Sequence, residues 1–220
     1  NCEKLIDVYD QVMGVKVYQI GKGKPKQTSY EIDKNLFIKD KKIDENHYKF
    51  VSQGIGRYSY KSKGEWINYG EWLAEPRQLR YFNQPKIVIR EIVNPRIYAT
   101  YIEEKAVVKN IAAVIVEKDP NYSLKYLLAL LNSKLFTYYL FEQTPKGSNK
   151  SYPSFTSEII KNIPIKKISL NEQKIFADLV DKILTEIQKG ENTADNEKLI
   201  DTMVYELYHI TEEEQKLIEG

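Results

Sequence analysis

The chain has 220 residues, of which 42% are hydrophobic and 29% are charged, and its formal net charge is +2. This composition is typical of a soluble globular protein that can bury a real core. A single cysteine, Cys2, excludes an internal disulfide framework and a cysteine-based zinc site, which fits a reducing cytoplasm. No apolar run reaches the ~18 residues that a bilayer crossing needs. Because the sequence begins with Asn1 and not with Met, we expect a fragment of a longer protein.

The small net charge conceals a division along the chain. Residues 169–220 carry 5 basic and 13 acidic side chains, whereas residues 1–168 carry 28 basic and 18 acidic ones. A net positive segment attracts polyanions, so residues 1–168 are the better candidate for contact with nucleic acid. The alternative is that both segments are ordinary solvated surfaces.

The first part of the chain predicts short elements joined by polar loops. Residues 1–14 indicate a short helix or strand that ends at Gly14, and residues 21–28 (GKGKPKQT) form a basic loop. A strand and a turn are expected over 37–44. Residues 47–84 are rich in Tyr, Gly and Arg and favour short strands and loops.

Three β-rich runs follow, at 86–93, 96–102 and 110–116. Turns are expected at residues 94–95 (NP) and 119–120 (DP), because proline cannot continue a central strand. Together with the preceding segment, these runs predict a mixed or antiparallel sheet.

The segment 123–165 predicts an apolar helix, a polar loop and a second short helix. Ser123 is a suitable N-cap, and Pro164 is expected to stop the second helix. The loop 144–152 contains no large aliphatic side chain and offers groups for phosphates and base edges. One helical face carries the three-and-four spacing of Leu124, Leu127, Leu128, Leu131, Leu135, Tyr138 and Tyr139.

Residues 169–220 predict an α-helical end. Ser169 with Glu172 and Thr211 with Glu214 fit capping boxes, and Gly190 is a plausible helix end. Apolar side chains line one helical face in each of two helices: Ile175, Phe176, Leu179, Val180, Ile183, Leu184 and Ile187, then Leu199, Ile200, Met203, Val204, Leu207 and Tyr208. The fold class is therefore α+β, with an α/β domain over 1–168. The helical segment 169–220 is either separate or packed as part of the same domain.

The sequence contains no recognisable catalytic motif. Gly21 and Gly23 lack the spacing of a phosphate-binding loop, and a simple basic turn is the better interpretation. Glu103 and Lys105 resemble a minimal nuclease pair, but no acidic residue precedes them at short range, so a solvated hairpin tip is favoured. His47 has no obvious metal partner. We therefore predict no catalytic, cofactor-binding or metal-binding residues in this segment.

Several segments, read in order, resemble the TaqI-like C-terminal specificity (target recognition) domain of Type IIG restriction–modification enzymes and adenine-N6 DNA methyltransferases. Each is weak alone, but together they cover nearly the whole chain. They are GVKVY at 14–18 with GKGKPKQT at 21–28, GIGRY at 54–58, YG at 69–70 with WLAEPR at 72–77, PKIVIR at 85–90, YLLALLNSK at 126–134, and IDTMVYELY at 200–208 with TEEE at 211–214.

The resemblance implies a module that recognises a short double-stranded DNA sequence. In the family this domain follows a methyltransferase domain and often a nuclease, and neither is present here. The parent is then expected to be a site-specific adenine-N6 DNA methyltransferase, fused or not to a Type II endonuclease. S-adenosylmethionine and Mg²⁺ are implied for the parent only, and the implied partners are double-stranded DNA and the methyltransferase domain of the same polypeptide.

Candidate DNA contacts follow from side-chain chemistry, since arginine suits guanine, asparagine suits adenine, and lysine holds phosphates. For Arg57 the alternative is an internal pair with a carboxylate, and for the basic loop it is simple solvation. Trp66, Trp72 and Tyr69 are more often core residues than stacking platforms. The candidate DNA-binding residues are Lys22, Lys24, Lys26, Arg57, Tyr58, Arg77, Arg80, Lys146, Ser148, Asn149 and Lys150.

A second function class stays open from the sequence. The acidic helices of 169–220 could dock on a methyltransferase or on a second copy, which would make this chain a protein-interaction or dimerisation module without direct DNA readout. A third class, an enzyme with an unrecognised site, ranks last.

Overall fold

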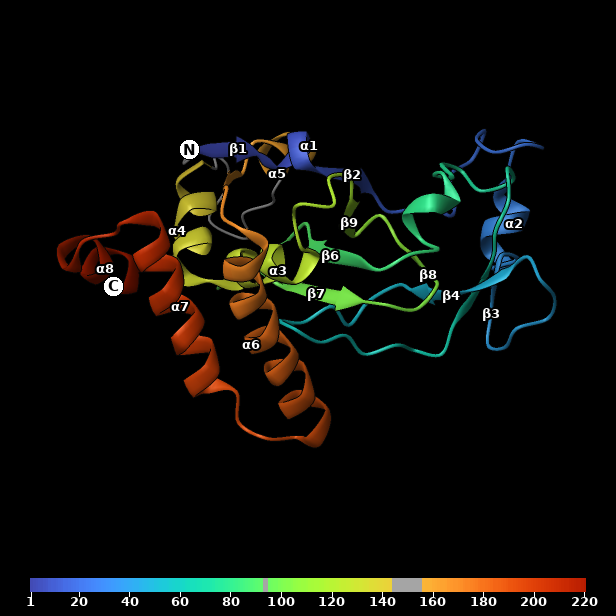
Figure 1. The fold of residues 1–220 in the computed structure, drawn as a ribbon. Helices are drawn as coiled ribbons and strands as arrows, with labels where there is room; N and C mark the ends of the chain where they lie inside the picture. The colour runs from blue at the N-terminus through green and yellow to red at the C-terminus, as the bar shows by residue number, and fades with distance from the viewer. Residues whose placement is uncertain (93–94, 144–155) are drawn as a thin grey trace.

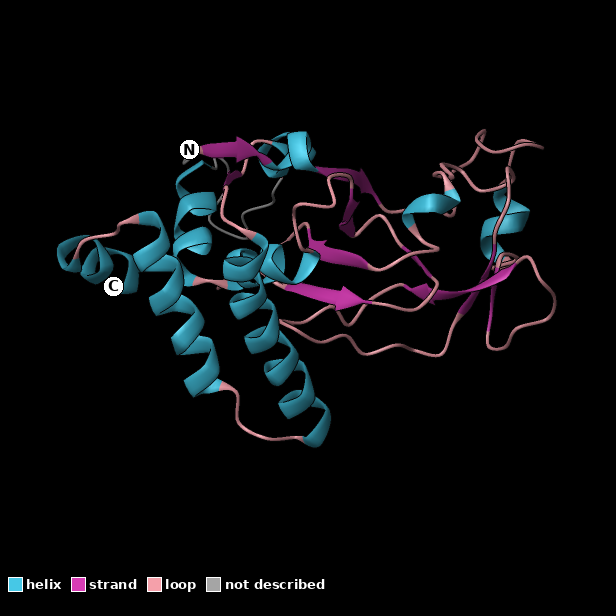
Figure 2. Cartoon of the chain, in the orientation of Figure 1, coloured by secondary structure: helices cyan, strands magenta, loops and turns pink. Residues whose placement is uncertain are grey.

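A computed structural model describes residues 1–92, 95–143 and 156–220. Helices gather at one end of the molecule, and most strands and long loops lie at the other (Figure 2). The strands are β1 Cys2–Lys4, β2 Tyr9–Met13, β3 Ile38–Lys39, β4 His47–Val51, β5 Trp66–Asn68, β6 Lys86–Arg90, β7 Ala99–Ile102, β8 Ala106–Val108, β9 Ala112–Glu117 and β10 Pro164–Lys166. The helices are α1 Leu5–Val8, α2 Ser29–Asp33, α3 Leu124–Asn132, α4 Lys134–Gln143, α5 Ser157–Lys161, α6 Leu170–Lys189, α7 Ala194–Tyr208 and α8 Glu212–Glu219, with a 3₁₀ turn η1 at Leu79–Tyr81.

Two four-stranded sheets organise the described chain (Figure 1). The central sheet has the order β2-β9-β6-β7 and is antiparallel throughout. The second sheet has the order β3-β5-β4-β8, in which β4 and β8 are parallel. We call β3, β4, β5, β8, α2 and the loop 19–28 the outer lobe. The short strands β1 and β10 pair separately and bring the start of the chain beside residue 166.

The central sheet is buried on both faces because its strands alternate between two cores. Ile87 and Ile89 of β6 pack with the helices, whereas Val88 packs with the outer lobe. Successive side chains of a strand point to opposite faces, so the run KIVIR supplies both cores at once. The result is three layers: outer lobe, central sheet and helices.

The apolar segment after Ser123 forms two helices and not the single helix that the spacing predicts. Ser123 caps α3 as expected, and its hydroxyl accepts from the main chain of Lys125 and Tyr126. The chain leaves the helical conformation at Ser133, whose ψ is 158°. The Ser133 hydroxyl then accepts from the Phe136 N–H, while the Asn132 side chain bonds both main-chain groups of Ala99. These polar contacts compensate for the interrupted helix.

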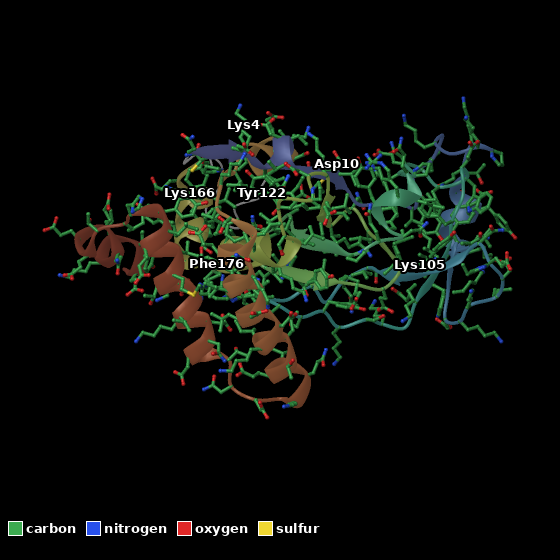
Figure 3. The ribbon with its side chains drawn as sticks, in the orientation of Figure 1. Lys4, Asp10, Lys105, Tyr122, Lys166 and Phe176 are labelled. Atoms are coloured by element: carbon green, nitrogen blue, oxygen red, sulfur yellow. The ribbon has the colours of Figure 1, made fainter. Side chains whose placement is uncertain are left out.

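The helical end confirms the capping signals. Ser169 with Glu172 and Thr211 with Glu214 form capping boxes, and Gly190 ends α6 with a φ of 72°. Phe176 on α6 lies close to the body of the molecule in Figure 3 and is 5% exposed. Ile175 and Leu199 were expected on the buried faces, yet both are exposed, because each lies at the margin of its apolar stripe.

The α+β class predicted from the sequence is confirmed, with antiparallel and parallel pairing in the sheets and helices packed beside them. Phe176, Val180 and Val204 share one core with Ile87 and Leu127, so α6 and α7 pack on the body. Within the described ranges, none of the helices combines the length and the apolar run that a membrane crossing requires.

Candidate nucleic-acid interface

The basic loop 19–28, which we call the lysine loop, is braced on its neighbours by one buried amide. Gln27 is 3% exposed. Its Nε2 donates to the main-chain oxygens of Val17 at 2.9 Å and Trp72 at 2.7 Å, and its Oε1 accepts from the Gln19 N–H at 2.9 Å. The Lys24 N–H also donates to the Glu71 oxygen at 2.8 Å. A loop rich in lysine and glycine is thereby held in one conformation.

Gly23 makes this close approach possible. Its φ is +84°, and a Cβ there would lie 2.3 Å from the Trp72 oxygen. Only glycine adopts this conformation without strain and without a clash. The segment 70–75 is itself fixed to the body, because the Ala74 N–H donates to the Val17 oxygen and Glu75 exchanges main-chain hydrogen bonds with Lys16.

The three lysines of this loop point into solvent. Lys22, Lys24 and Lys26 are exposed. Lys24 lies 3.7 Å from Glu71, in a pair whose two side chains are about four-fifths exposed. The side chains of Lys22 and Lys26 have no hydrogen-bond or ion-pair partner in the part of the chain that the structure describes. Solvent-exposed ammonium groups on a support held by hydrogen bonds suit phosphate contact.

Arg77 and Arg80 follow the braced segment but are already engaged. The Arg77 Nε donates to the Met13 oxygen at 3.1 Å, and its Nη2 pairs with Glu75 at 2.9 Å. Arg80 pairs with Asp10 at 2.7 Å and stacks on the Tyr81 ring at 4.2 Å from the centroid. The Arg80 side chain is half-exposed, although its three guanidinium nitrogens already donate to Gln78, Asp10 and Tyr81, whereas Arg77 is three-quarters buried.

Arg57 lies elsewhere, beside the helices. Its Nη1 donates to the Asn132 oxygen at 2.7 Å, and its Nη2 pairs with Glu197 of α7. The Arg57 side chain is 16% exposed and that of Glu197 is 23% exposed. The structure therefore favours the internal pair that the sequence left open as an alternative. Tyr58 is buried next to it, and burial raises the pKa of its hydroxyl.

A second arginine completes this cluster, which we call the clamp: Arg57, Arg96, Glu197 and Asp201. The Arg96 guanidinium lies 3.8 Å from Asp201, whose other oxygen accepts from the Lys134 N–H at 2.7 Å. Burial raises the pKa of the Asp201 carboxyl. Burial acts to raise the pKa of the Glu197 carboxyl, but the charges of Arg57 and Arg96 and the hydrogen bonds from Thr193 and Arg57 together hold it below its usual value. The clamp ties α7 to the body.

The sequence-predicted contacts thus fall into separate places. The lysine loop belongs to the outer lobe, Arg77 and Arg80 follow the segment that braces it, and Arg57 and Tyr58 lie at the helical end. Lys146, Ser148, Asn149 and Lys150 lie outside the described residues, as does Asn94 of the predicted 94–95 turn.

Sequence reasoning missed two features of the outer lobe. Gln27 lies within the predicted basic loop, and its position before the capping-box residue Thr28 of α2 is the signal that could have indicated a fixed loop end. Lys41 and Lys42, between β3 and β4, add exposed cations to the same lobe. Trp72 is partly buried, and its ring nitrogen donates to the Asn68 oxygen at 3.0 Å, so the core interpretation of this tryptophan fits.

No group of three or more His, Cys, Asp or Glu side chains in the described ranges is placed to hold a metal ion. His47 is buried, and its Nδ1 lies 2.6 Å from the Asp44 carboxylate.

Comparison with known proteins gives three kinds of similarity. The model of the TaqI-like C-terminal specificity domain matches residues 49–165. A Methanocaldococcus jannaschii protein named as a type II restriction enzyme and methyltransferase is 30% identical over 178 residues, which cover 77% of this chain and 15% of that protein. This chain therefore spans about one-seventh of the length of the curated relative it matches.

Solved structures share the fold at low sequence identity. A DNA complex of the Type IIL restriction–modification enzyme MmeI has a TM-score of 0.64 at 11% identity, covering 95% of this chain and 34% of that one. The Type IIG restriction endonuclease BpuSI has a TM-score of 0.52 at 12% identity, covering 93% and 31%. The HsdS subunit of Thermoanaerobacter tengcongensis has a TM-score of 0.51 at 14% identity, covering 94% and 44%.

Because the family model spans more than half of the chain, from β4 to β10, this chain belongs to the TaqI-like C-terminal specificity domain family.

Proposed function

We propose that this chain recognises a short sequence of double-stranded DNA for a restriction–modification protein and positions a methyltransferase domain of the same polypeptide. The observation that carries the proposal is the lysine loop, in which a buried amide holds three solvent-exposed lysines on a fixed support. Membership of a specificity-domain family supports the same function.

The lysines would bind phosphates and set the register on the duplex, while other groups read base edges in the major groove. Arg80 is half-exposed and is proposed as a contact of either kind. Arg77 is proposed as a base or phosphate contact that would first have to leave Glu75. The segment 144–152 stays a proposed DNA contact, with Lys146 and Lys150 for phosphates and Ser148 and Asn149 for base edges or sugars. For Arg57 and Tyr58 we propose a supporting role inside the clamp region.

The parent protein is proposed to transfer a methyl group from S-adenosylmethionine to adenine N6 in the cytoplasm. Its catalytic domain would take the adenine out of the stack. The name of the Methanocaldococcus jannaschii relative supports a parent that also carries a Type II endonuclease. We also propose that the recognition domain spans 1–168 and the helical segment 169–220.

Selection from a randomised duplex pool tests the DNA-recognition proposal directly. We expect one short sequence to be enriched on the intact chain, with an affinity that falls steeply as salt rises. If all sequences of the pool are enriched equally at every salt concentration, sequence-specific recognition is ruled out.

A charge-removal experiment locates the interface. Changing the three loop lysines to glutamine should reduce the slope of log affinity against log salt by about 2–3, since each phosphate contact contributes about 0.9. The matched control removes three exposed lysines from the acidic helices: Lys189, Lys198 and Lys216. An equal effect of both triple variants would show that only the net charge matters.

A second candidate function, docking on a protein partner, is favoured by exposed apolar side chains on the acidic helices. Leu170, Ile175, Leu199 and Leu217 are each about half to two-thirds exposed. The two functions are compatible, because docking would use α6–α8 and DNA binding would use the outer lobe. Sedimentation of the isolated chain distinguishes them: a defined oligomer without DNA retention at low salt supports docking alone.

A further inference from the structure

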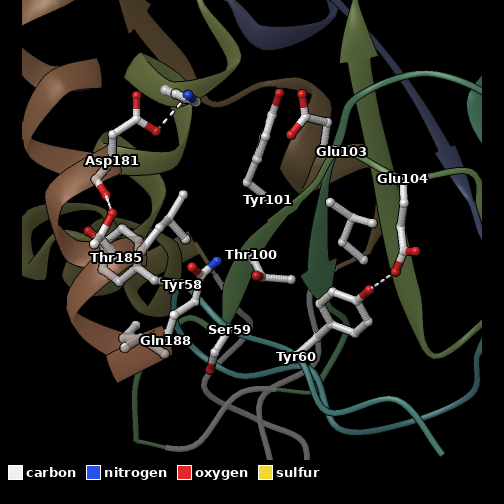
Figure 4. Close-up of a pocket in the computed structure, with 14 residues that line it drawn as sticks. Tyr58, Ser59, Tyr60, Thr100, Tyr101, Glu103, Glu104, Asp181, Thr185 and Gln188 are labelled. Atoms are coloured by element: carbon white, nitrogen blue, oxygen red, sulfur yellow. Dashed lines mark hydrogen bonds and ion pairs between the residues drawn. The ribbon is translucent and has the colours of Figure 1, made fainter. Parts of the chain in front are cut away.

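A cleft of about 690 Å³ runs along the outer edge of β7 (Figure 4). Thr100 and Tyr101 lie at its centre. Helix α6 forms one wall with Asp181 and Thr185, and Tyr60 and Glu104 stand on the other side. The cleft therefore wraps around the edge of the central sheet and reaches both of its faces.

The main chain of β7 is only partly covered at this edge. The Arg90 N–H donates to the Tyr98 oxygen at 3.0 Å, and the register pairs Val88 with Thr100. Antiparallel pairing alternates, so residues 98, 100 and 102 turn their main-chain groups toward β6, and residues 99 and 101 turn theirs outward. The Tyr58 N–H and the Asn132 side chain satisfy Ala99. Beyond them, the main chain of Tyr101 faces the cleft.

Two buried hydroxyls on the cleft wall lack partners. Tyr58 is 2% exposed and Thr100 is 0% exposed, and neither hydroxyl has a hydrogen-bond partner among the described residues. Buried polar atoms are nearly always hydrogen-bonded, so the described residues leave the polar groups of this cleft wall incompletely paired.

The charge at the cleft mouth fits a cationic ligand. Asp181 pairs with Lys125 at 2.6 Å, and Glu104 pairs with Lys49. Glu103 is exposed and has no ion pair in the described ranges, so its carboxylate is the one left unneutralised on this rim. A carboxylate at the rim repels the phosphates of nucleic acid and attracts lysine or arginine.

We propose that this cleft binds an extended polypeptide segment that adds as a strand to the edge of β7. The segment would exchange main-chain hydrogen bonds with Tyr101 and place one lysine or arginine on Glu103. Strand addition of this kind derives affinity from the main chain and specificity from alternate side chains. The proposal does not depend on the DNA-binding function, since its residues lie outside the lysine loop.

Peptide selection on the intact chain tests the proposal. Random dodecapeptides are displayed, and fluorescence anisotropy then measures the affinity of individual binders. We expect binders with one basic residue among β-branched residues. The Glu103→Gln variant should weaken them about tenfold, as expected for loss of one charge-assisted hydrogen bond. The matched control, Glu213→Gln on the exposed first turn of α8, should leave the affinity unchanged.

A change in the peptide isolates strand addition without altering the protein. N-methylation of alternate peptide nitrogens should abolish binding when the methylated set faces β7, and should leave it unchanged when the other set is methylated. Binders that are indifferent to both N-methylation patterns, or the absence of any binder sensitive to Glu103, would overturn the proposal. Displacement of the peptide by duplex DNA would overturn it too, because the cleft would then belong to the DNA interface.

Discussion

The lysine loop and the clamp are both built around cations, yet their surroundings give them opposite roles. The lysines extend into solvent from a loop that main-chain contacts hold in place. The arginines of the clamp are mostly buried against Glu197 and Asp201, and these carboxylates neutralise their charges inside the molecule. The sequence presents both as basic residues in polar segments. Burial decides which of them can meet a polyanion.

Removing the carboxylate of the clamp should have the largest effect. Glu197→Ala leaves Arg57 without its ion-pair partner in a mostly buried site, so we expect a loss of about 2–4 kcal/mol in the free energy of unfolding. Urea denaturation measures this loss, and the matched control is Glu213→Ala on the exposed turn of α8. A loss below about 0.5 kcal/mol would mean that the pair behaves like an exposed surface pair.

Lys86 sharpens the comparison, because it is a fully buried cation with only main-chain oxygens as partners. Its Nζ donates to the oxygens of Gln84 and Glu104 at 2.9 and 2.7 Å, and burial lowers the pKa of Lys86 to about 8. The folded state therefore binds fewer protons than the unfolded state above pH 8, and stability should rise with pH.

The Lys86→Met variant should lack this rise. The difference in unfolding free energy between wild type and variant should grow by about 2 kcal/mol from pH 8 to pH 10. Burial raises the pKa of Tyr58, Tyr126 and other tyrosines, which reduces stability above pH 10, but these terms are common to both proteins and cancel in the difference. A difference that is flat over this window would show that Lys86 stays charged.

The brace of the lysine loop should have an intermediate effect on stability. Gln27→Ala removes the three side-chain hydrogen bonds of the brace, so we expect a loss of about 1–3 kcal/mol in the free energy of unfolding, because main-chain groups are left unpaired. DNA affinity should fall as well, since the lysines lose their support. Gln53→Ala, at an exposed position, is the control. If the Gln27→Ala protein is destabilised but keeps its normal DNA affinity, the brace stabilises the fold and is not needed for DNA binding.

A single loop lysine should have the smallest effect on stability and still affect DNA binding. Lys22→Gln should change the free energy of unfolding by less than about 0.5 kcal/mol. The salt slope of DNA binding should fall by about 0.9. Titrations at several salt concentrations measure this slope, and an unchanged slope would remove Lys22 from the interface.

Local signals of the sequence predicted much of the fold. Capping boxes depend on residues only three positions apart, so Ser169 and Thr211 could be identified from their neighbours. The interruption at Ser133 could not, because it depends on the Asn132 side chain reaching Ala99 on a strand far away in the sequence. The spacing of apolar residues continues through the break and conceals it.

The candidate site was harder to predict for the same reason. The lysine loop is basic in any conformation, so its exposure could be expected from residues 21–28 alone. Arg57 meets Glu197 across 140 positions, and no local pattern announces that contact. Gly54 and Gly56 lie just before Arg57 and could allow the main chain to approach a ligand closely. In the structure this segment instead bonds β7 through the Tyr58 N–H and the Ala99 oxygen, and Arg57 bonds the Asn132 oxygen and Glu197.

The hydrogen bonds of Gln27 have a consequence for how this domain could change its target. The Gln27 amide forms hydrogen bonds only with main-chain atoms, at Val17, Gln19 and Trp72. The attachment of the loop therefore does not depend on the side chains of these three residues. Residues 22, 24 and 26 can then be exchanged while Gly23 and Gln27 are kept. The lysine loop could therefore accept new contact residues at these positions while its attachment and the sheet beneath it stay unchanged.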